Sequence, residues 1–223
     1  MKQSALVLPI TVRISEIFVS LQGEGTHAGL PTFFVRLAGC NLACRWCDTV
    51  YARQEKGKTI SVEEILKHWQ REGCLPWIQI TGGEPLLQEG VYPLMKAFLD
   101  QNTTVLLETN GSLPLRKVPP EVVKVMDIKC PSSGMSSRMC WENLAHLGVK
   151  DQVKFVIANK EDYEWAKEIV KQRYLTYYTQ VLFSPVFKAL EPAELANWIL
   201  RDRLPVRFQL QLHKILWGER RGV

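Results

Sequence analysis

The sequence of 223 residues has no long hydrophobic segment. Its longest apolar runs, such as "VLLE" and "KFVIA", are far shorter than the roughly 20 residues that a membrane-spanning helix needs. The N-terminal segment is interrupted by Pro9, Arg13 and Glu16 and has no small-residue cleavage site, which argues against a secretion signal. We therefore expect a cytoplasmic protein with no membrane association.

The sequence also lacks internal repeats, low-complexity tracts and any linker long enough to divide domains. Its length suits one α/β domain, so we expect residues 1–223 to form a single domain. The net charge is +5, but basic and acidic residues are interleaved rather than massed into a stripe. Small anionic ligands explain this charge as well as a nucleic acid does, and we expect no nucleic-acid partner.

The six cysteines do not have the spacing of a disulfide framework. Three are far apart, whereas Cys40, Cys44 and Cys47 form a C-x3-C-x2-C run. A structural zinc site usually needs four ligands, and the chain has no second C-x2-C unit and only dispersed histidines. Zinc is therefore the weaker alternative. A 4Fe-4S cluster held by three thiolates keeps one iron open to another ligand, which is typical of a site that performs chemistry.

Short apolar segments alternate with amphipathic ones along the chain. We expect strands at 32–37, 77–81, 103–109, 122–128, 153–158, 180–184 and 206–212, and helices at 61–72, 90–101, 161–172 and 191–202. Ser61 and Glu64 have the spacing of a capping box at the start of the first helix. Strands that alternate with helices predict a parallel sheet with helical crossovers.

Several motifs follow the ends of these predicted strands: "TGGEP" at 81–85, "ETNGS" at 108–112, "KCPSSG" at 129–134 and "SPVF" at 184–187. In parallel sheets and barrels, this is the edge where ligands bind. A complete eight-unit barrel typically needs about 250 residues, so we expect an incomplete, laterally open α/β barrel.

Within "TGGEP", two glycines and a carboxylate suggest ligand binding. Gly82 and Gly83 would allow a ligand to approach the backbone closely, and Glu84 offers a carboxylate for an ammonium group. The motif alone describes many turns. Its position on the same predicted edge as the cysteine run makes the combination much more specific.

The segments "CNLACRWCD" and "TGGEP" together resemble the radical S-adenosylmethionine (SAM) enzymes. With "LQGEG", Arg36 and "CDT", the chain is similar over nearly its whole length to the branch that converts 6-carboxy-5,6,7,8-tetrahydropterin to 7-carboxy-7-deazaguanine for queuosine-type deazapurines. The resemblance implies a radical SAM partial TIM-like barrel, a 4Fe-4S cluster, SAM and Mg2+. It further implies ring contraction with loss of ammonia, a homodimer, and an electron donor such as a flavodoxin or ferredoxin.

The resemblance also assigns residues. The cluster would be held by Cys40, Cys44 and Cys47, and Mg2+ by Thr49. SAM would be bound by Trp46, Asp48, Gly83, Glu84, Ser132 and Ser133. The pterin would be bound by Leu21, Gln22, Gly23, Glu24, Arg36 and Thr81.

Alternatives stay open at this stage. Arg36 could be a surface charge, Glu24 a turn residue and Glu108 a solvated charge, although the position of Glu108 above the sheet favours ligand contact. His213 could be structural or touch a ligand. Two other functions compete: an activase that generates a glycyl radical in a partner protein, and an electron-transfer protein, which would prefer a fourth protein ligand and would not need "TGGEP".

Overall fold

Nine strands form one sheet in the computed structural model, which describes residues 9–223. Residues 1–8, which belong to the segment considered above as a secretion signal, lie outside the described residues. The order is β3-β1-β2-β4-β5-β6-β7-β8-β9. The strands are β1 (Thr11–Leu21), β2 (Pro31–Leu37), β3 (Lys58–Ser61), β4 (Trp77–Gly82), β5 (Thr104–Thr109), β6 (Val123–Ile128), β7 (Gln152–Ile157), β8 (Gln180–Pro185) and β9 (Arg207–Phe208).

The sheet is parallel from β2 to β9 and is extended by antiparallel strands at one side. There β1 pairs with both β2 and β3 in antiparallel register. Because β3 and β9 are the two ends of the order, the barrel does not close. The expected incomplete α/β barrel is confirmed, but the antiparallel strands β1 and β3 were not predicted.

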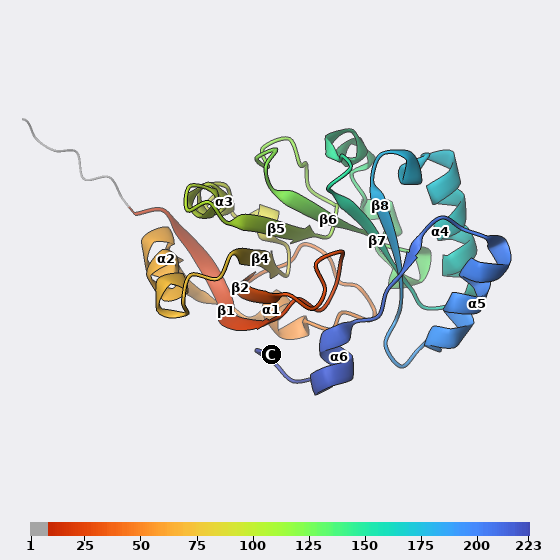
Figure 1. Ribbon diagram of the computed structural model, residues 1–223, viewed down its shortest axis with the longest axis horizontal. Coiled ribbons are helices and arrows are strands. Elements are labelled where there is room, and N and C mark those ends of the chain that lie inside the picture. The colour runs from red at the N-terminus through yellow and green to blue at the C-terminus, as the bar shows by residue number, and fades with distance from the viewer. Residues whose placement is uncertain (1–8) are drawn as a thin grey trace, which may run out of the picture.

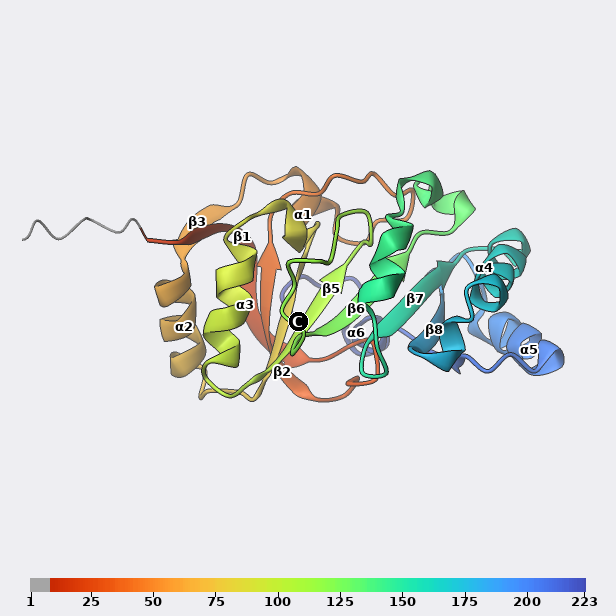
Figure 2. The same cartoon turned by 90° about the horizontal axis from the view of Figure 1, so that it is seen from above.

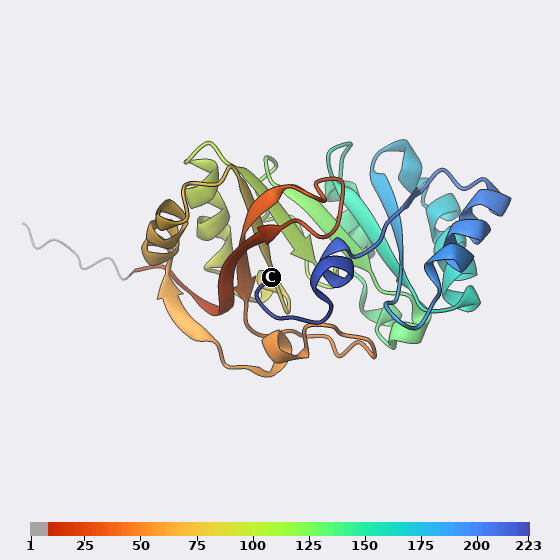
Figure 3. The ribbon, with the colours of Figure 1, turned by 60° about the horizontal axis from the view of Figure 1, so that its bottom comes forward.

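Six α-helices accompany the sheet in the described residues: α1 (Val50–Gln54), α2 (Val62–Arg71), α3 (Val91–Leu99), α4 (Lys160–Gln172), α5 (Pro192–Asp202) and α6 (Leu212–Trp217). Helices α2 to α5 flank the outside of the curved sheet (Figures 1 and 2). Helix α6 lies apart from them, near the loop between β1 and β2 (Figure 3). Five short 3-10 turns complete the chain, at Pro85–Leu87, Pro131–Ser133, Ser136–Arg138, Trp141–His146 and Leu175–Tyr177.

Local sequence explains most of these elements. The Ser61 side chain accepts a hydrogen bond from the Glu64 backbone N–H, and the Glu64 carboxylate accepts one from the Ser61 N–H, so the predicted capping box starts α2. Strand β6 is buried along its whole length, as expected for a parallel strand covered on both faces. Aromatic side chains fill the space between the sheet and the outer helices, as in the edge-to-face pair of Phe155 and Phe183.

The predicted strand at 206–212 is wrong beyond its first residues. Strand β9 contains only Arg207 and Phe208, and α6 begins at Leu212. The alternating pattern "VRFQLQL" suggested an edge strand, but its glutamine side chains have other partners. Gln209 accepts from the Gly25 N–H, and Gln211 donates to Glu24, so this segment turns toward the loop between β1 and β2.

None of the helices in residues 9–223 is both long enough and apolar enough to cross a membrane.

Candidate active site

The three cysteines of the C-x3-C-x2-C run lie in one loop, residues 38–49, between β2 and α1. This segment is called the cysteine loop below. All three cysteines are free and partly exposed. Figure 2 shows the loop, in orange, along one edge of the sheet, with the loop after β6 beside it, where the Arg45 N–H donates to the Ser133 carbonyl at 3.2 Å. The Asn41 amide donates to the Ser112 hydroxyl after β5 at 2.8 Å. The cysteine loop therefore meets two of the motifs expected at the carboxyl edge, "ETNGS" and "KCPSSG".

The sulfur atoms have polar neighbours that suit thiolates. The Sγ of Cys40 lies 3.5 Å from the Leu42 N–H and 3.7 Å from the Asn110 amide. Burial raises the pKa of the Cys40 and Cys44 thiols, and the Lys129 ammonium opposes this effect at Cys44. Iron would hold both as thiolates, because a metal competes with the proton.

The arrangement fits a cluster better than a single zinc ion. Within residues 9–223, no three His, Cys, Asp or Glu side chains converge on one point as ligands of a single ion must. A 4Fe-4S cube needs no such convergence, because each thiolate binds a different iron at a different corner. A donor set of three thiolates therefore suits an iron-sulfur cluster.

The two glycines of "TGGEP" allow close packing of the backbone against the end of β2 and the start of the cysteine loop, and the expected approach of a ligand to this backbone stays a prediction. A Cβ atom on Gly82 would lie 2.3 Å from the Leu37 carbonyl oxygen, and one on Gly83 would lie 2.2 Å from the Gly39 carbonyl oxygen. The backbones are joined there: the Gly83 N–H donates to Leu37, and the Glu84 N–H donates to Gly39. Glycine at both positions thus lets the two loops touch.

The Glu84 side chain has several hydrogen-bond partners within the protein. It is fully buried, and its carboxylate accepts hydrogen bonds from the Leu86 N–H at 3.0 Å, the Thr109 hydroxyl at 2.9 Å and the Asn110 N–H at 2.7 Å. Burial raises its pKa, and these hydrogen bonds oppose the rise. The carboxylate therefore joins the ends of β4 and β5, and its expected contact with an ammonium ligand stays a prediction.

Ser132 and Ser133 are likewise occupied within the protein. The Ser132 hydroxyl donates to the Asp162 carboxylate, and the Ser133 hydroxyl donates to the Cys130 carbonyl. Ser132 is partly exposed and Ser133 is buried, and their expected contact with SAM stays a prediction. The loop's evident role is to support the cysteine loop through the Ser133 carbonyl.

Two of the candidate pterin residues, Glu24 and Thr81, belong to a group of side chains around Lys154, which was not predicted from the sequence. The Lys154 ammonium lies 2.6 Å from a Glu24 oxygen and 2.5 Å from a Glu108 oxygen. The Thr81 hydroxyl donates to the other Glu108 oxygen at 3.3 Å. Although desolvation opposes it, Lys154 lowers the pKa of Glu108, and the carboxylates around Lys154 raise the pKa of its ammonium.

The other residues of "LQGEG" support this group. The Gln22 amide donates to the Gln79 side chain at 2.6 Å in the buried interior. A Cβ on Gly23 would lie 2.2 Å from Nδ1 of His213, so glycine allows α6 to pack against this loop. Glu24 also accepts from the Gln211 amide at 2.8 Å and is therefore more than a turn residue.

Arg36 is oriented by an ion pair. Its Nε lies 2.6 Å from the Glu16 carboxylate, and its guanidinium lies over the Phe18 ring. Only 17% of its side chain is exposed, so it is not the free surface charge considered above. Within residues 9–223, nothing accepts a hydrogen bond from its two Nη atoms, which leaves one side of the fork for a ligand.

Asp48 and Thr49 follow the last cysteine and face α6. The Thr49 hydroxyl donates to Asp48 at 3.0 Å, and Asp48 pairs with Lys214 at 3.1 Å. Although desolvation opposes it, these contacts lower the pKa of Asp48. Trp46 is partly exposed beside them.

Comparison with known proteins identifies the family. A model of the radical SAM superfamily matches residues 35–128. The 7-carboxy-7-deazaguanine synthase of Chlorobaculum tepidum is 46% identical over 95% of this chain and 97% of its own length. That of Koribacter versatilis is 42% identical over 95% of this chain and all of its own length. The chain belongs to the 7-carboxy-7-deazaguanine synthase family.

A solved structure supports the fold assignment. The crystal structure of QueE from Escherichia coli has a TM-score of 0.77 at 22% identity and covers 92% of this chain and 95% of its own. The open, mostly parallel sheet thus corresponds to the partial barrel of the radical SAM enzymes.

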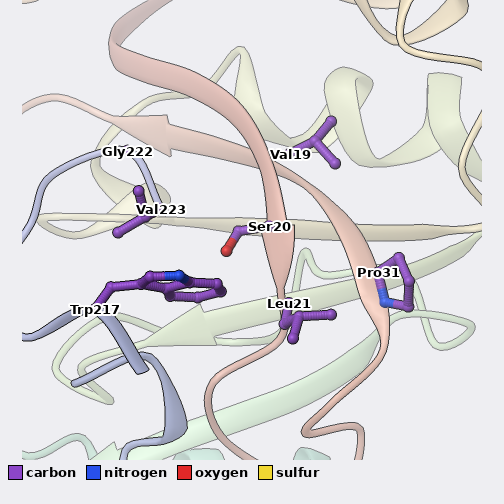
Figure 4. Close-up of a pocket in the computed structure, with 7 residues that line it drawn as sticks. All are labelled: Val19, Ser20, Leu21, Pro31, Trp217, Gly222 and Val223. Atoms are coloured by element: carbon purple, nitrogen blue, oxygen red, sulfur yellow. The ribbon is translucent and has the colours of Figure 1, made fainter. Parts of the chain in front are cut away.

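A pocket of about 360 Å³ lies on another part of this family member, between β1 and the C-terminal residues (Figure 4). Of the candidate substrate residues, Leu21 alone lines it, beside Trp217 and Val223. The expected contact of Leu21 with the pterin stays a prediction.

We predict that Glu84→Gln destabilises the protein, because an amide cannot replace a buried carboxylate that accepts from three donors. The expected loss is about 1.5–3 kcal/mol in the free energy of unfolding, measured by urea titration. Glu89→Gln, at a side chain that is 79% exposed, is the matched control and should change little. Equal unfolding midpoints for wild type and Glu84→Gln would contradict this role.

Proposed function

We propose that this chain is a radical SAM lyase that converts 6-carboxy-5,6,7,8-tetrahydropterin to 7-carboxy-7-deazaguanine with loss of ammonia, in queuosine-type deazapurine biosynthesis. The observation that carries the proposal is its identity of up to 46% with 7-carboxy-7-deazaguanine synthases over nearly the full length of both chains. The site adds support, because the cysteine loop, the "TGGEP" loop and the Lys154 group lie at one end of the sheet.

The cysteines Cys40, Cys44 and Cys47 would hold the 4Fe-4S cluster, with the backbone of Gly83 and the partly exposed Trp46 near SAM. When bound, the cluster and SAM supply the radical that removes a hydrogen atom from carbon 6 of the pterin. The protein's own contribution is to position the reactants and to keep water out.

The substrate carboxylate would be bound by Arg36. Its Nε is engaged by Glu16, and its Nη atoms can form the charge-assisted hydrogen bonds that a carboxylate accepts. The Glu16 pair fixes the plane of the guanidinium. On the other side of the site, Glu24 and Thr81 would contact the polar edge of the pterin.

A magnesium ion would be bound at Thr49. Because the hydroxyl hydrogen is donated to Asp48, the oxygen lone pairs are available to a cation. Magnesium prefers octahedral oxygen coordination and commonly keeps several waters, so one hydroxyl with a substrate carboxylate is a reasonable ligand set.

The remaining partners are part of the proposal. A flavodoxin or ferredoxin would supply electrons, and the single domain would act in the cytoplasm. A homodimer is supported by three exposed apolar side chains: Val19, which lines the pocket of Figure 4 and is 40% exposed, and Ile215 and Leu216 on α6, which are 58% and 49% exposed. Light scattering should give a mass of two chains, and a single-chain mass would exclude the dimer.

The proposed activity can be assayed directly. Anaerobically reconstituted protein with reductant, SAM, Mg2+ and the carboxylated pterin should yield the deazaguanine, identified by mass. Cys40→Ala should lose both iron and turnover because one thiolate ligand is gone, whereas Cys74→Ala, at an exposed cysteine, should retain both. Full iron content and turnover in Cys40→Ala would disprove the cluster site. Absence of product from the wild type would favour an activase or an electron-transfer protein.

Thr49→Ala should weaken the response to magnesium while leaving iron content unchanged, because it removes one oxygen ligand and no thiolate. A magnesium titration of turnover measures this, with Thr49→Ser, which keeps the hydroxyl, as the matched control. If the alanine variant responds to magnesium like the wild type, the metal is not bound at Thr49.

A further inference from the structure

Lys154 is a buried cation between carboxylates from three different elements. Its side chain is 4% exposed. The ammonium lies 2.6 Å from Glu24 in the loop between β1 and β2, 2.5 Å from Glu108 on β5 and 3.6 Å from Asp127 on β6. A buried ammonium is costly unless it is paired, and this one is paired with residues that are distant in the sequence. Its contacts therefore fix the relative positions of separate parts of the site.

The two close carboxylates are not equivalent to Asp127. Asp127 has its own cation, because Lys129 lies 2.9 Å from it. Glu24 and Glu108 instead share the Lys154 ammonium, and both line a narrow cavity together with Gln22 and Gln79. The lysine thus holds two carboxylates that face the same interior space.

The other charged and titratable groups near this pair come from every neighbouring element. They are His27 in the loop between β1 and β2, Arg36 on β2, Asp48 in the cysteine loop, Asp127 and Lys129 at the end of β6, and His213 on α6. Of these, only Asp127 approaches the Lys154 ammonium within 4 Å in residues 9–223. Lys154 is therefore the main source of positive charge at Glu108.

We propose that Lys154 is a positioning residue that holds Glu24 and Glu108 at a fixed spacing, as ionised acceptors for the N–H donors of the substrate's aminopyrimidinone ring. The inference rests on the proposed function and adds to it the residue that determines recognition of the heterocycle. An adjacent pair of N–H donors matches the two oxygens of a carboxylate and would not match a protonated carboxyl group.

The pH dependence of substrate binding distinguishes this positioning role of Lys154 from a purely structural one. Removing the ammonium leaves Glu108 buried without its cation, so its pKa should rise, and the binding-competent carboxylate should be lost as the pH falls. In Lys154→Met, binding should therefore weaken about tenfold for each pH unit below the raised pKa and recover at higher pH. In the wild type, the lowered pKa of Glu108 keeps its carboxylate ionised, so the binding affinity should not change with pH over the same pH range.

The experiment measures binding without turnover. Fluorescence of 6-carboxypterin, an oxidised ligand that cannot react, reports its Kd with the reconstituted protein and SAM between pH 5 and 7, where the ring N–H of the ligand keeps its proton, and kcat and KM for the substrate are measured in parallel. Lys154→Met should show a pH-dependent loss of affinity that appears in KM more than in kcat. A uniform loss at all pH values, or an unchanged Kd, would overturn the proposal.

The chain provides a matched control in Lys124 on β6. Its side chain is 5% exposed and its ammonium lies 3.3 Å from Asp151, but it contacts none of the candidate substrate residues. Lys124→Met should cost stability and leave the pH profile of binding unchanged. The same pH shift in this variant would show that loss of any buried lysine produces the effect, and would overturn the proposal.

A double variant tests whether Glu108 is the group that titrates, and it also covers the case in which the single variant does not fold. In Lys154→Met/Glu108→Gln no carboxyl group titrates at position 108, and Glu24 keeps the hydrogen bonds from Gln209 and Gln211, so weak binding should become independent of pH. A persisting shift would assign the titration to His27 or His213 and contradict the proposal. If Lys154→Met does not fold, pH-independent weak binding by the double variant supports the proposal, and wild-type affinity overturns it. If the proposed function is wrong, the wild type itself will neither bind the pterin nor form product.

Discussion

The close backbone contact between the cysteine loop and the "TGGEP" loop is the constraint on which the rest of the site depends. A peptide hydrogen bond from Glu84 to Gly39 joins the loops, a second from Gly83 reaches Leu37 at the end of β2, and the geometry leaves no room for a Cβ at Gly82 or Gly83. Glu84 then carries the connection onward through Thr109 and Asn110 to the end of β5. Since the Asn110 amide approaches the Cys40 sulfur, the position of the cysteines is set by three adjacent segments and not by their loop alone.

A second network, built on charge, lies beside the first. Lys154 joins Glu24 and Glu108, and the amide of Gln211 connects Glu24 with Asp48. Asp48 belongs to the cysteine loop and pairs with Lys214 of α6. The packed backbone contact and the ion-pair network therefore meet just after the last cysteine, where the proposed cofactor and substrate would be adjacent.

The sequence predicted what is encoded locally. Alternation of apolar segments located the helices α2 to α5 and the strands β2 and β4 to β8, and the capping box located the start of α2. Strand β1 was missed because its pattern is mixed, and it is held by antiparallel pairing with two other strands. Helix α6 was missed because the preceding glutamines suggested a strand, whereas the conformation of this segment depends on hydrogen bonds to residues far away in the sequence.

The site was predicted in its composition but not in the direction of its side chains. The spacing of the cysteines suffices for the cluster assignment, whereas the inward orientation of Glu84 depends on donors about 25 residues away. Lys154 lies in the apolar strand β7, and the sequence pattern around it would be the same if the lysine were exposed at the surface. Its partners lie 130 and 46 residues away in the sequence, and no local signal indicates them.

The central claim is that a bound SAM and the pterin lie next to each other above the cysteine loop. Deuterium at carbon 6 of the substrate tests it most directly, with label followed by mass spectrometry during turnover by the reconstituted enzyme. The account predicts that deuterium passes into the deoxyadenosyl group, that it returns to the product, and that each SAM molecule supports many turnovers. Product without any label in the deoxyadenosyl group, or one SAM consumed for each product molecule, would contradict it.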